Sequence, residues 1–278
     1  MTIRRFSQLD VFTTEPLRGN PLAVVHDASG LTDDQMAAFA RWTNLSETTF
    51  LLPPTDPRAD YRVRIFTPGG ELPFAGHPTL GSCHAWLAAG GAPRESSVVV
   101  QECGVGLVRV RRDGSRLAFA APPLRRSGPV DASTRDQVLT TLKLPAAKLR
   151  DLQWIDNGPG WIGALLASAD EVLALRPDFV AMGDLKLGVA GRFPAGSDCL
   201  IEVRAFVPTL GVKEDPVTGS LNAGFALWLI DAGLAPASYV ASQGAALGRS
   251  GRVHVDRVGG DTWIGGATTA VVDGTVAL

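Results

Sequence analysis

The chain has 278 residues, enough for one large domain or for two of ordinary size. Hydrophobic residues make up 45% of the chain and charged residues 19%, so sizeable cores can be buried. The formal net charge is −2 and no basic run is present, which argues against nucleic acid as a partner.

The cysteines and histidines point away from metal or disulfide chemistry. Cys83, Cys103 and Cys199 are scattered, without a Cys-x-x-Cys spacing, and the four histidines show no ligand spacing. This pattern suits a reducing compartment and argues against a disulfide framework or a zinc site. The first residues lack an apolar core of signal-peptide length, and no stretch approaches a membrane span. We expect a soluble cytoplasmic protein without metal or membrane contact.

In chain order, the first half predicts a series of short strands, with a helix after the second strand. A capping box at Thr32 and Gln35 predicts a helix that runs to about Thr43. A second, apolar helix is expected within residues 76–90. Strands are expected at residues 3–12, 22–25, 48–52, 61–66, 98–101, 106–111 and 117–120, from their β-branched and alternating patterns.

Residues 122–129 concentrate proline, glycine and charge and are the best linker candidate. The second half then repeats the order of the first, with expected strands at 153–156, 161–166, 201–206, 252–255 and 262–265. A final strand at 270–277 has no obvious partner in its own half. We therefore expect an N-terminal domain of residues 1–121, to which residues 268–278 return, and a C-terminal domain of residues 128–267.

The repeat is clearest in residues 64–90 and 204–233. Both read as a strand, a polar turn and an apolar helix that ends at glycine. Five residues of the first copy recur 143 positions later (214 − 71 for the first pair): Glu71, Pro73, Gly76, Gly81 and Gly90 match Glu214, Pro216, Gly219, Gly224 and Gly233. The chemistry differs, because His77 corresponds to Ser220 and Leu72 to Asp215. The halves thus share a scaffold and differ in function.

Gly76 and Gly219 stand where each repeat turns into its helix. The first turn of a helix presents unpaired N–H groups and a positive dipole end, so two such starts could hold a carboxylate. The alternative is that both are merely tight turns. His77 at such a start should be neutral, because the dipole disfavours its protonated form.

The carboxylates are harder to assign from the sequence. Asp215 could act in a site or simply cap its helix. Glu71 and Glu214 recur at equal positions and are interpreted as structural acceptors of the turn. Spacing alone does not favour Glu47 over Asp33 or Asp60 as a catalytic group.

Several motifs together resemble the phenazine-biosynthesis PhzF-like family, over about residues 6–276. They are Asp10-Val-Phe-Thr, Gly19-Asn-Pro-Leu-Ala-Val-Val, Ser46-Glu-Thr-Thr-Phe, Phe66-Thr-Pro, Glu71-Leu-Pro-Phe-Ala-Gly-His-Pro and Glu214-Asp-Pro-Val-Thr-Gly-Ser. The resemblance implies the diaminopimelate epimerase-like fold. This is an α+β fold of two similar domains from internal duplication, each a curled, barrel-like mixed sheet around a central helix, with the active site in the interdomain cleft.

The resemblance also implies an activity: a cofactor-independent isomerase that moves a proton on a small carboxylate-bearing substrate. Glu47 would be the acid/base, with His77 and Asp215 in the catalytic set. Gly76, Gly219, Ser220 and Asn20 would bind substrate. Related racemases use a cysteine at each helix start, and neither start here has one, so a two-thiol racemase is disfavoured. A homodimer is expected by the same resemblance. The alternatives are an epimerase or lyase that uses the same carboxylate, and a non-catalytic small-molecule binding protein.

Overall fold

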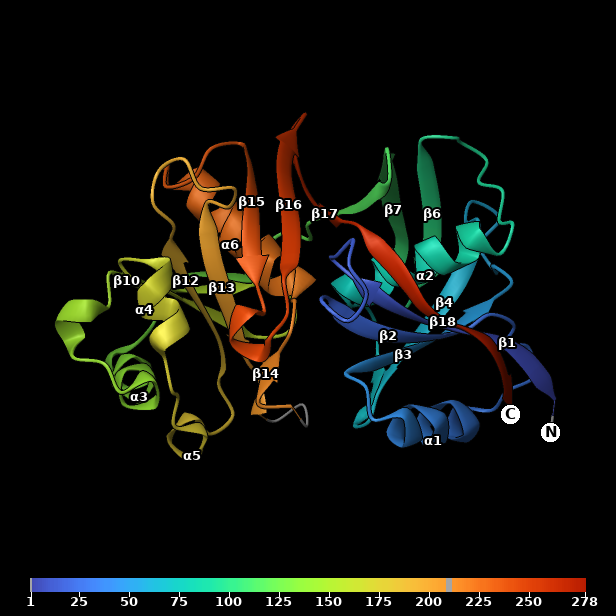
Figure 1. The fold of residues 1–278 in the computed structure, drawn as a ribbon, viewed down its shortest axis with the longest axis horizontal. Helices are drawn as coiled ribbons and strands as arrows, with labels where there is room; N and C mark the ends of the chain where they lie inside the picture. Colours follow the sequence, from blue (N-terminus) through green and yellow to red (C-terminus); the bar gives the residue numbers. More distant parts are fainter. Residues whose placement is uncertain (1, 209–211) are drawn as a thin grey trace. The chain divides into compact units, whose positions relative to one another are not determined.

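The computed structural model describes residues 2–208 and 212–278 (Figure 1). Thr209, Leu210 and Gly211, part of the second copy of the repeat, lie outside the described residues, as does Met1. The chain forms two compact units, one of Met1–Ala120 with Gly265–Leu278 and the other of Ala121–Ile264.

The first unit is a mixed sheet around a buried helix. Its order of neighbouring strands is β18-β1-β2-β3-β4-β6-β7-β8, with parallel pairing of β2 to β3 and of β4 to β6, and β5 as a short addition to β4. Its elements are β1 (Ile3–Val11), β2 (Asn20–Val25), α1 (Asp33–Thr43), β3 (Glu47–Leu52), β4 (Tyr61–Thr67), β5 (Gly70–Leu72), α2 (Gly76–Ala88), β6 (Val98–Cys103), β7 (Gly106–Asp113), β8 (Arg116–Ala120) and β18 (Thr268–Ala277).

The second unit repeats this pairing strand for strand. β10 to β16 pair with the same alternation of antiparallel and parallel neighbours as β1 to β7, and β9 lies beside β10 as β18 lies beside β1. Its elements are β9 (Arg126–Pro129), α3 (Ala132–Leu142), η1 (Ala146–Lys148), β10 (Asp151–Asp156), β11 (Trp161–Leu165), α4 (Ala169–Ala174), α5 (Phe179–Met182), β12 (Lys186–Arg192), β13 (Ile201–Phe206), β14 (Glu214–Asp215), α6 (Gly219–Asp231), β15 (Ser238–Gln243), η3 (Ala245–Leu247), β16 (Gly251–Val258) and β17 (Asp261–Gly266), in which the unit ends.

The α+β fold and the expected strands of the first half are confirmed, whereas several segments of the second half differ from expectation. Residues 126–129 were expected to be a linker and instead form β9, an antiparallel partner of β10. Pro129 is the last residue of this short strand. The helix α3, which begins at the N-cap Asp131, was not expected at all.

The repeated glycines serve the two central helices. A Cβ on Gly81 would lie 2.4 Å from Leu22, and one on Gly224 would lie 2.5 Å from the Ile155 carbonyl oxygen. Glycine therefore lets α2 and α6 approach their sheets closely. Both helices are apolar on nearly all sides, as expected of a helix enclosed by its own sheet.

The repeated glutamates pair with repeated arginines. Nε and Nη2 of Arg64 donate to Glu71 at 2.7 and 2.6 Å, and those of Arg204 donate to Glu214 at 2.8 and 2.7 Å. Each arginine also lies over a phenylalanine two residues on, at 5.1 Å from the ring centre of Phe66 and 5.0 Å from that of Phe206. These two bidentate arginine–glutamate pairs join β5 to β4 and β14 to β13. They thereby stabilise the turns that lead into α2 and α6.

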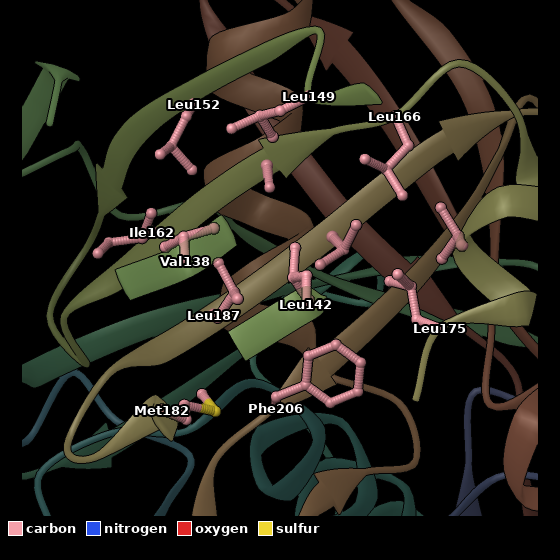
Figure 2. Close-up of a cluster of buried hydrophobic side chains, with 13 residues drawn as sticks. Val138, Leu142, Leu149, Leu152, Ile162, Leu166, Leu175, Met182, Leu187 and Phe206 are labelled. Carbon is pink, nitrogen blue, oxygen red and sulfur yellow. The ribbon is translucent and has the colours of Figure 1, made fainter. Parts of the chain in front are cut away.

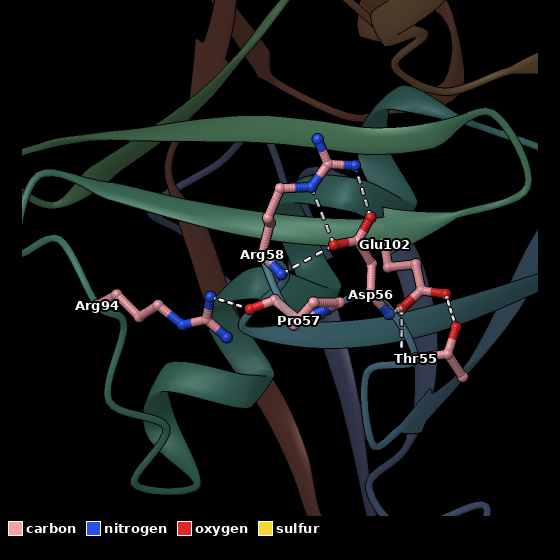
Figure 3. A network of polar contacts seen from close by, with 6 residues as sticks. All are labelled: Thr55, Asp56, Pro57, Arg58, Arg94 and Glu102. Atoms are coloured by element: carbon pink, nitrogen blue, oxygen red, sulfur yellow. Dashed lines mark hydrogen bonds and ion pairs between the residues drawn. The ribbon is translucent and has the colours of Figure 1, made fainter.

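Two further features stabilise the units. In the second unit, side chains of α3 and α5 pack on β10 to β13 around Leu187 and Phe206 (Figure 2). In the first unit, the loop after β3 is held by Glu102, whose carboxylate accepts hydrogen bonds from the backbone of Thr55 at 2.6 Å and of Asp56 at 3.0 Å (Figure 3). Arg94 donates to the carbonyl of Pro57 in the same loop.

Candidate active site

The first unit brings Glu47 and His77 together. Glu47 is the first residue of β3, and His77 is the second residue of α2. The His77 Nε2 and Glu47 Oε2 atoms are 3.4 Å apart, with side chains 4% and 15% exposed. A carboxylate from a strand end thus meets an imidazole at a helix start, in a nearly closed environment.

Asn20 lies on the other side of the imidazole. It is the first residue of β2 and is fully buried. Its Nδ2 is 3.3 Å from His77 Nδ1, and Ser46 Oγ donates to its Oδ1 at 3.4 Å. Three of the residues predicted from the sequence, Glu47, His77 and Asn20, therefore lie in one group, and Ser46 extends it.

His77 is neutral at pH 7. Burial lowers its pKa from 6.5 to about 3, against a weaker upward effect of a hydrogen bond to the Pro21 backbone. The sequence pointed to the helix dipole as the reason, whereas in the structure burial is the main cause. The imidazole beside the Glu47 carboxylate therefore carries no positive charge at pH 7.

This burial links stability to pH. Because the folded state binds a proton on His77 less readily than the unfolded chain, stability is kept above pH 6.5 and lost as pH falls from 6.5 toward 3. We expect the free energy of unfolding to fall by about 1.4 kcal/mol per pH unit from this group, or about 2 kcal/mol at pH 5. His77→Asn should remove that part of the slope in urea unfolding at pH 7 and pH 5. Identical slopes in both proteins would contradict the assignment.

The second unit holds Asp215, Gly219 and Ser220. Asp215 ends β14, and its Oδ2 accepts a 2.5 Å hydrogen bond from Thr218 Oγ1. The Ser220 hydroxyl, on the first turn of α6, accepts a 3.0 Å hydrogen bond from Trp161 Nε1. The N-cap of α6 is Thr218, whose own side chain forms no cap hydrogen bond.

A buried amide network holds this turn. Gln243 Oε1 accepts from the Thr218 backbone N–H at 3.0 Å and from Asn222 Nδ2 at 2.8 Å. Gln243 Nε2 donates to the Asp215 carbonyl at 3.1 Å and to Thr218 Oγ1 at 2.9 Å. Gln243 thus links the Asp215 carbonyl to the Thr218 hydroxyl, which in turn donates to the Asp215 carboxylate.

The helix starts themselves are unusual within this protein. The α-helices α1, α3, α4 and α5 each begin with a side chain that accepts a backbone N–H: those of Thr32, Asp131, Ser168 and Asp178. Among the six described α-helices, α2 and α6 are the two that begin without such a cap. Gly76 and Gly219, the first residues of these helices, are both buried. Uncapped N–H groups at a helix start suit an anionic ligand.

The repeat would have identified a residue that sequence reasoning missed. Asn20 begins β2 and contacts His77, whereas Trp161 begins β11 and contacts Ser220. The first residue of the second strand therefore touches the second residue of the central helix in both units. Aligning the two halves through residues 20 and 161 would have singled out Trp161. Gln243 and Thr218 give no comparable signal.

Two surface hollows of the second unit, of about 310 and 890 Å³, are lined by none of the predicted site residues, although the larger includes Glu214. Within the described part of the chain, no cluster of three or more His, Cys, Asp or Glu could hold a metal ion. No helix in that part is long and apolar enough to cross a membrane.

This duplicated α+β fold matches solved structures of PhzF-family proteins and of a predicted epimerase, and curated relatives of the chain are named as isomerases. The family model described as "Phenazine biosynthesis-like protein" (PhzC-PhzF) matches residues 9–274, and the chain belongs to this family.

Three relatives illustrate the membership. Antisense-enhancing sequence 1 of Schizosaccharomyces pombe is 37% identical over 273 residues, which cover 92% of each chain. The trans-2,3-dihydro-3-hydroxyanthranilate isomerase of Pseudomonas aeruginosa is 35% identical over 82% of this chain and 80% of its own. A solved structure described as a predicted epimerase from Pseudomonas aeruginosa is 30% identical, with a TM-score of 0.80 over 99% of each chain.

Proposed function

We propose that this isomerase moves a proton on a small carboxylate-bearing substrate without a cofactor, with Glu47 as the acid/base. The observation that carries the proposal is the 3.4 Å contact between Glu47 Oε2 and the buried Nε2 of neutral His77. Proton transfer at carbon needs a positioned carboxylate of sufficient basicity.

The neutrality of His77 matters for that basicity. A histidinium at this distance would stabilise the negative charge of the carboxylate and make it a weaker base. The neutral imidazole beside Glu47 adds no such positive charge. The N–H groups at the start of α2 stabilise negative charge that develops on the substrate as the proton leaves carbon.

We further propose that Asp215 and Ser220 of the second unit take part in the same reaction. The uncapped start of α6 and the rigid turn around Asp215 support a substrate-binding role. Substitution of either residue should raise KM more than it lowers kcat if that role is binding.

The expected surroundings of the enzyme are also proposals. We propose a homodimer, a small-molecule carboxylate as the substrate, and a cytoplasmic location, the last supported by three free cysteines. Analytical ultracentrifugation of the full chain tests the dimer, with a single monomeric species as the contradicting result.

An epimerase is the second candidate, because a structural relative at 30% identity is described as a predicted epimerase. The two activities differ in where the proton returns. An isomerase delivers it to a different carbon, whereas an epimerase returns it to the same carbon with inverted configuration.

Proton NMR in deuterated water distinguishes an isomerase from an epimerase. Wild type and Glu47→Gln are incubated with trans-2,3-dihydro-3-hydroxyanthranilate and with pooled small amino and hydroxy acids. Deuterium at a new carbon, only with wild type, supports the isomerase. Deuterium at the original carbon with a change in optical rotation supports the epimerase. No exchange across the pool, with ligand binding retained, would overturn both in favour of a binding protein.

A further inference from the structure

Asn157 carries an unused acceptor at the start of α6. It lies in the turn between β10 and β11 and is 6% exposed. Its Nδ2 donates to the backbone carbonyl of Ser220 at 2.8 Å. Within residues 2–208 and 212–278, its Oδ1 is buried and has no hydrogen-bond partner.

The orientation of this amide follows from its surroundings. Exchanging its oxygen and nitrogen would set Oδ1 against the Ser220 carbonyl oxygen, an acceptor facing an acceptor. The turn is also rigid, because Asp156 Oδ1 accepts from the backbone N–H groups of Gly158 at 2.7 Å and Gly160 at 2.6 Å. Turning the Asn157 oxygen toward another partner would break the bond that Nδ2 donates to the Ser220 carbonyl.

The neighbouring groups are donors. In the hydrogen bond between Trp161 Nε1 and Ser220 Oγ, the indole N–H can only donate, so Ser220 Oγ accepts. The Ser220 hydroxyl hydrogen is therefore available to donate to another group. α6 has no side-chain cap at its first turn. The start of α6 thus combines donors suited to a carboxylate with one buried acceptor suited to an N–H or O–H group.

We propose that Asn157 is a specificity-determining residue whose Oδ1 accepts a hydrogen bond from a ligand held at the start of α6. The ligand class is a carboxylate with an amino or hydroxyl group on a neighbouring carbon. The inference rests on the proposed function, in which this helix start binds the substrate. A ligand without that donor leaves the oxygen buried and unpaired, which is how hydrogen-bonding sites reject such analogues.

Anthranilate and benzoate form a matched pair of probes, because they share the ring and the carboxylate and differ in the ortho amino group. Isothermal titration of the full chain should show anthranilate binding about 5–100-fold more tightly than benzoate. Asn157→Ala should bring anthranilate to the level of benzoate and leave benzoate nearly unchanged. Shifts of the Gly219 and Ser220 amide resonances should accompany binding of both probes.

Trp161→Phe is the matched control, since it removes the bond to Ser220 Oγ and leaves Asn157 in place. It should weaken both probes together and keep their ratio. An equal preference in wild type, an unchanged ratio in Asn157→Ala, or no shift at Gly219 and Ser220 would overturn the inference. Glu47-dependent deuterium exchange is measured separately, so a failure here leaves the proposed catalytic role standing.

Discussion

Replacing Glu47 with glutamine is expected to lower the rate of proton exchange at substrate carbon by about 10²–10⁴-fold. Glutamine keeps the size of the side chain and a hydrogen-bonding group beside His77, but it cannot take a proton from carbon. Binding should change little, so the loss should fall on kcat. Deuterium incorporation followed by NMR gives the rate directly.

Glu15→Gln is a suitable control for this measurement. Glu15 is an exposed glutamate of the same unit, and the same chemical change there should leave the exchange rate within twofold of wild type. An exchange rate of Glu47→Gln within tenfold of wild type would remove Glu47 from the role of acid/base. Circular dichroism of both variants establishes that the fold is retained.

Arg204→Ala should destabilise the protein by about 3–5 kcal/mol, because it leaves the buried carboxylate of Glu214 without its partner. The side chains of Arg204 and Glu214 are 6% and 8% exposed. Arg204 Nη1 also donates to the carbonyls of Val172 at 3.2 Å and Leu175 at 2.9 Å, which lose a donor.

The repeat provides an internal control for this prediction. Arg64 and Glu71 form the same bidentate ion pair, but their side chains are 18% and 42% exposed, so water can replace the lost partner. Arg64→Ala should therefore cost about 1 kcal/mol or less. Urea unfolding of the two variants measures the difference. Equal losses would show that burial does not set the strength of these pairs.

The sequence predicted the duplication and its shared scaffold, because the identities recur at a constant spacing. It could not choose among Glu47, Asp33 and Asp60. In the structure, Asp33 pairs with Arg64 and Asp60 accepts from the Val100 backbone N–H, whereas Glu47 lies beside His77. The contact between Glu47 and His77 joins the first residue of β3 to the first turn of α2, 30 positions away (77 − 47). Local sequence patterns carry no information about a contact over that distance.

Other elements were hidden by their own packing. β12 was not predicted, since Gly188 and Gly191 break the pattern of strand-forming side chains. Close packing requires both glycines. A Cβ at Gly188 would lie 2.2 Å from a methyl carbon of Leu221, and a Cβ at Gly191 would lie 2.3 Å from the Ser168 carbonyl oxygen. The contacts of Asn157, Trp161 and Gln243 with the α6 turn span distant segments and could not be predicted from local spacing either.

The place of β18 has a consequence for synthesis on the ribosome. Residues 3–11 of the first unit pair with residues 268–277, and the backbones of Thr2 and Leu278 hydrogen-bond to each other. The second unit, by contrast, is one continuous segment, Ala121–Ile264. During synthesis, the sheet of the first unit therefore lacks β18 until the whole segment of the second unit has been made, whereas the second unit needs no residue from outside its own segment.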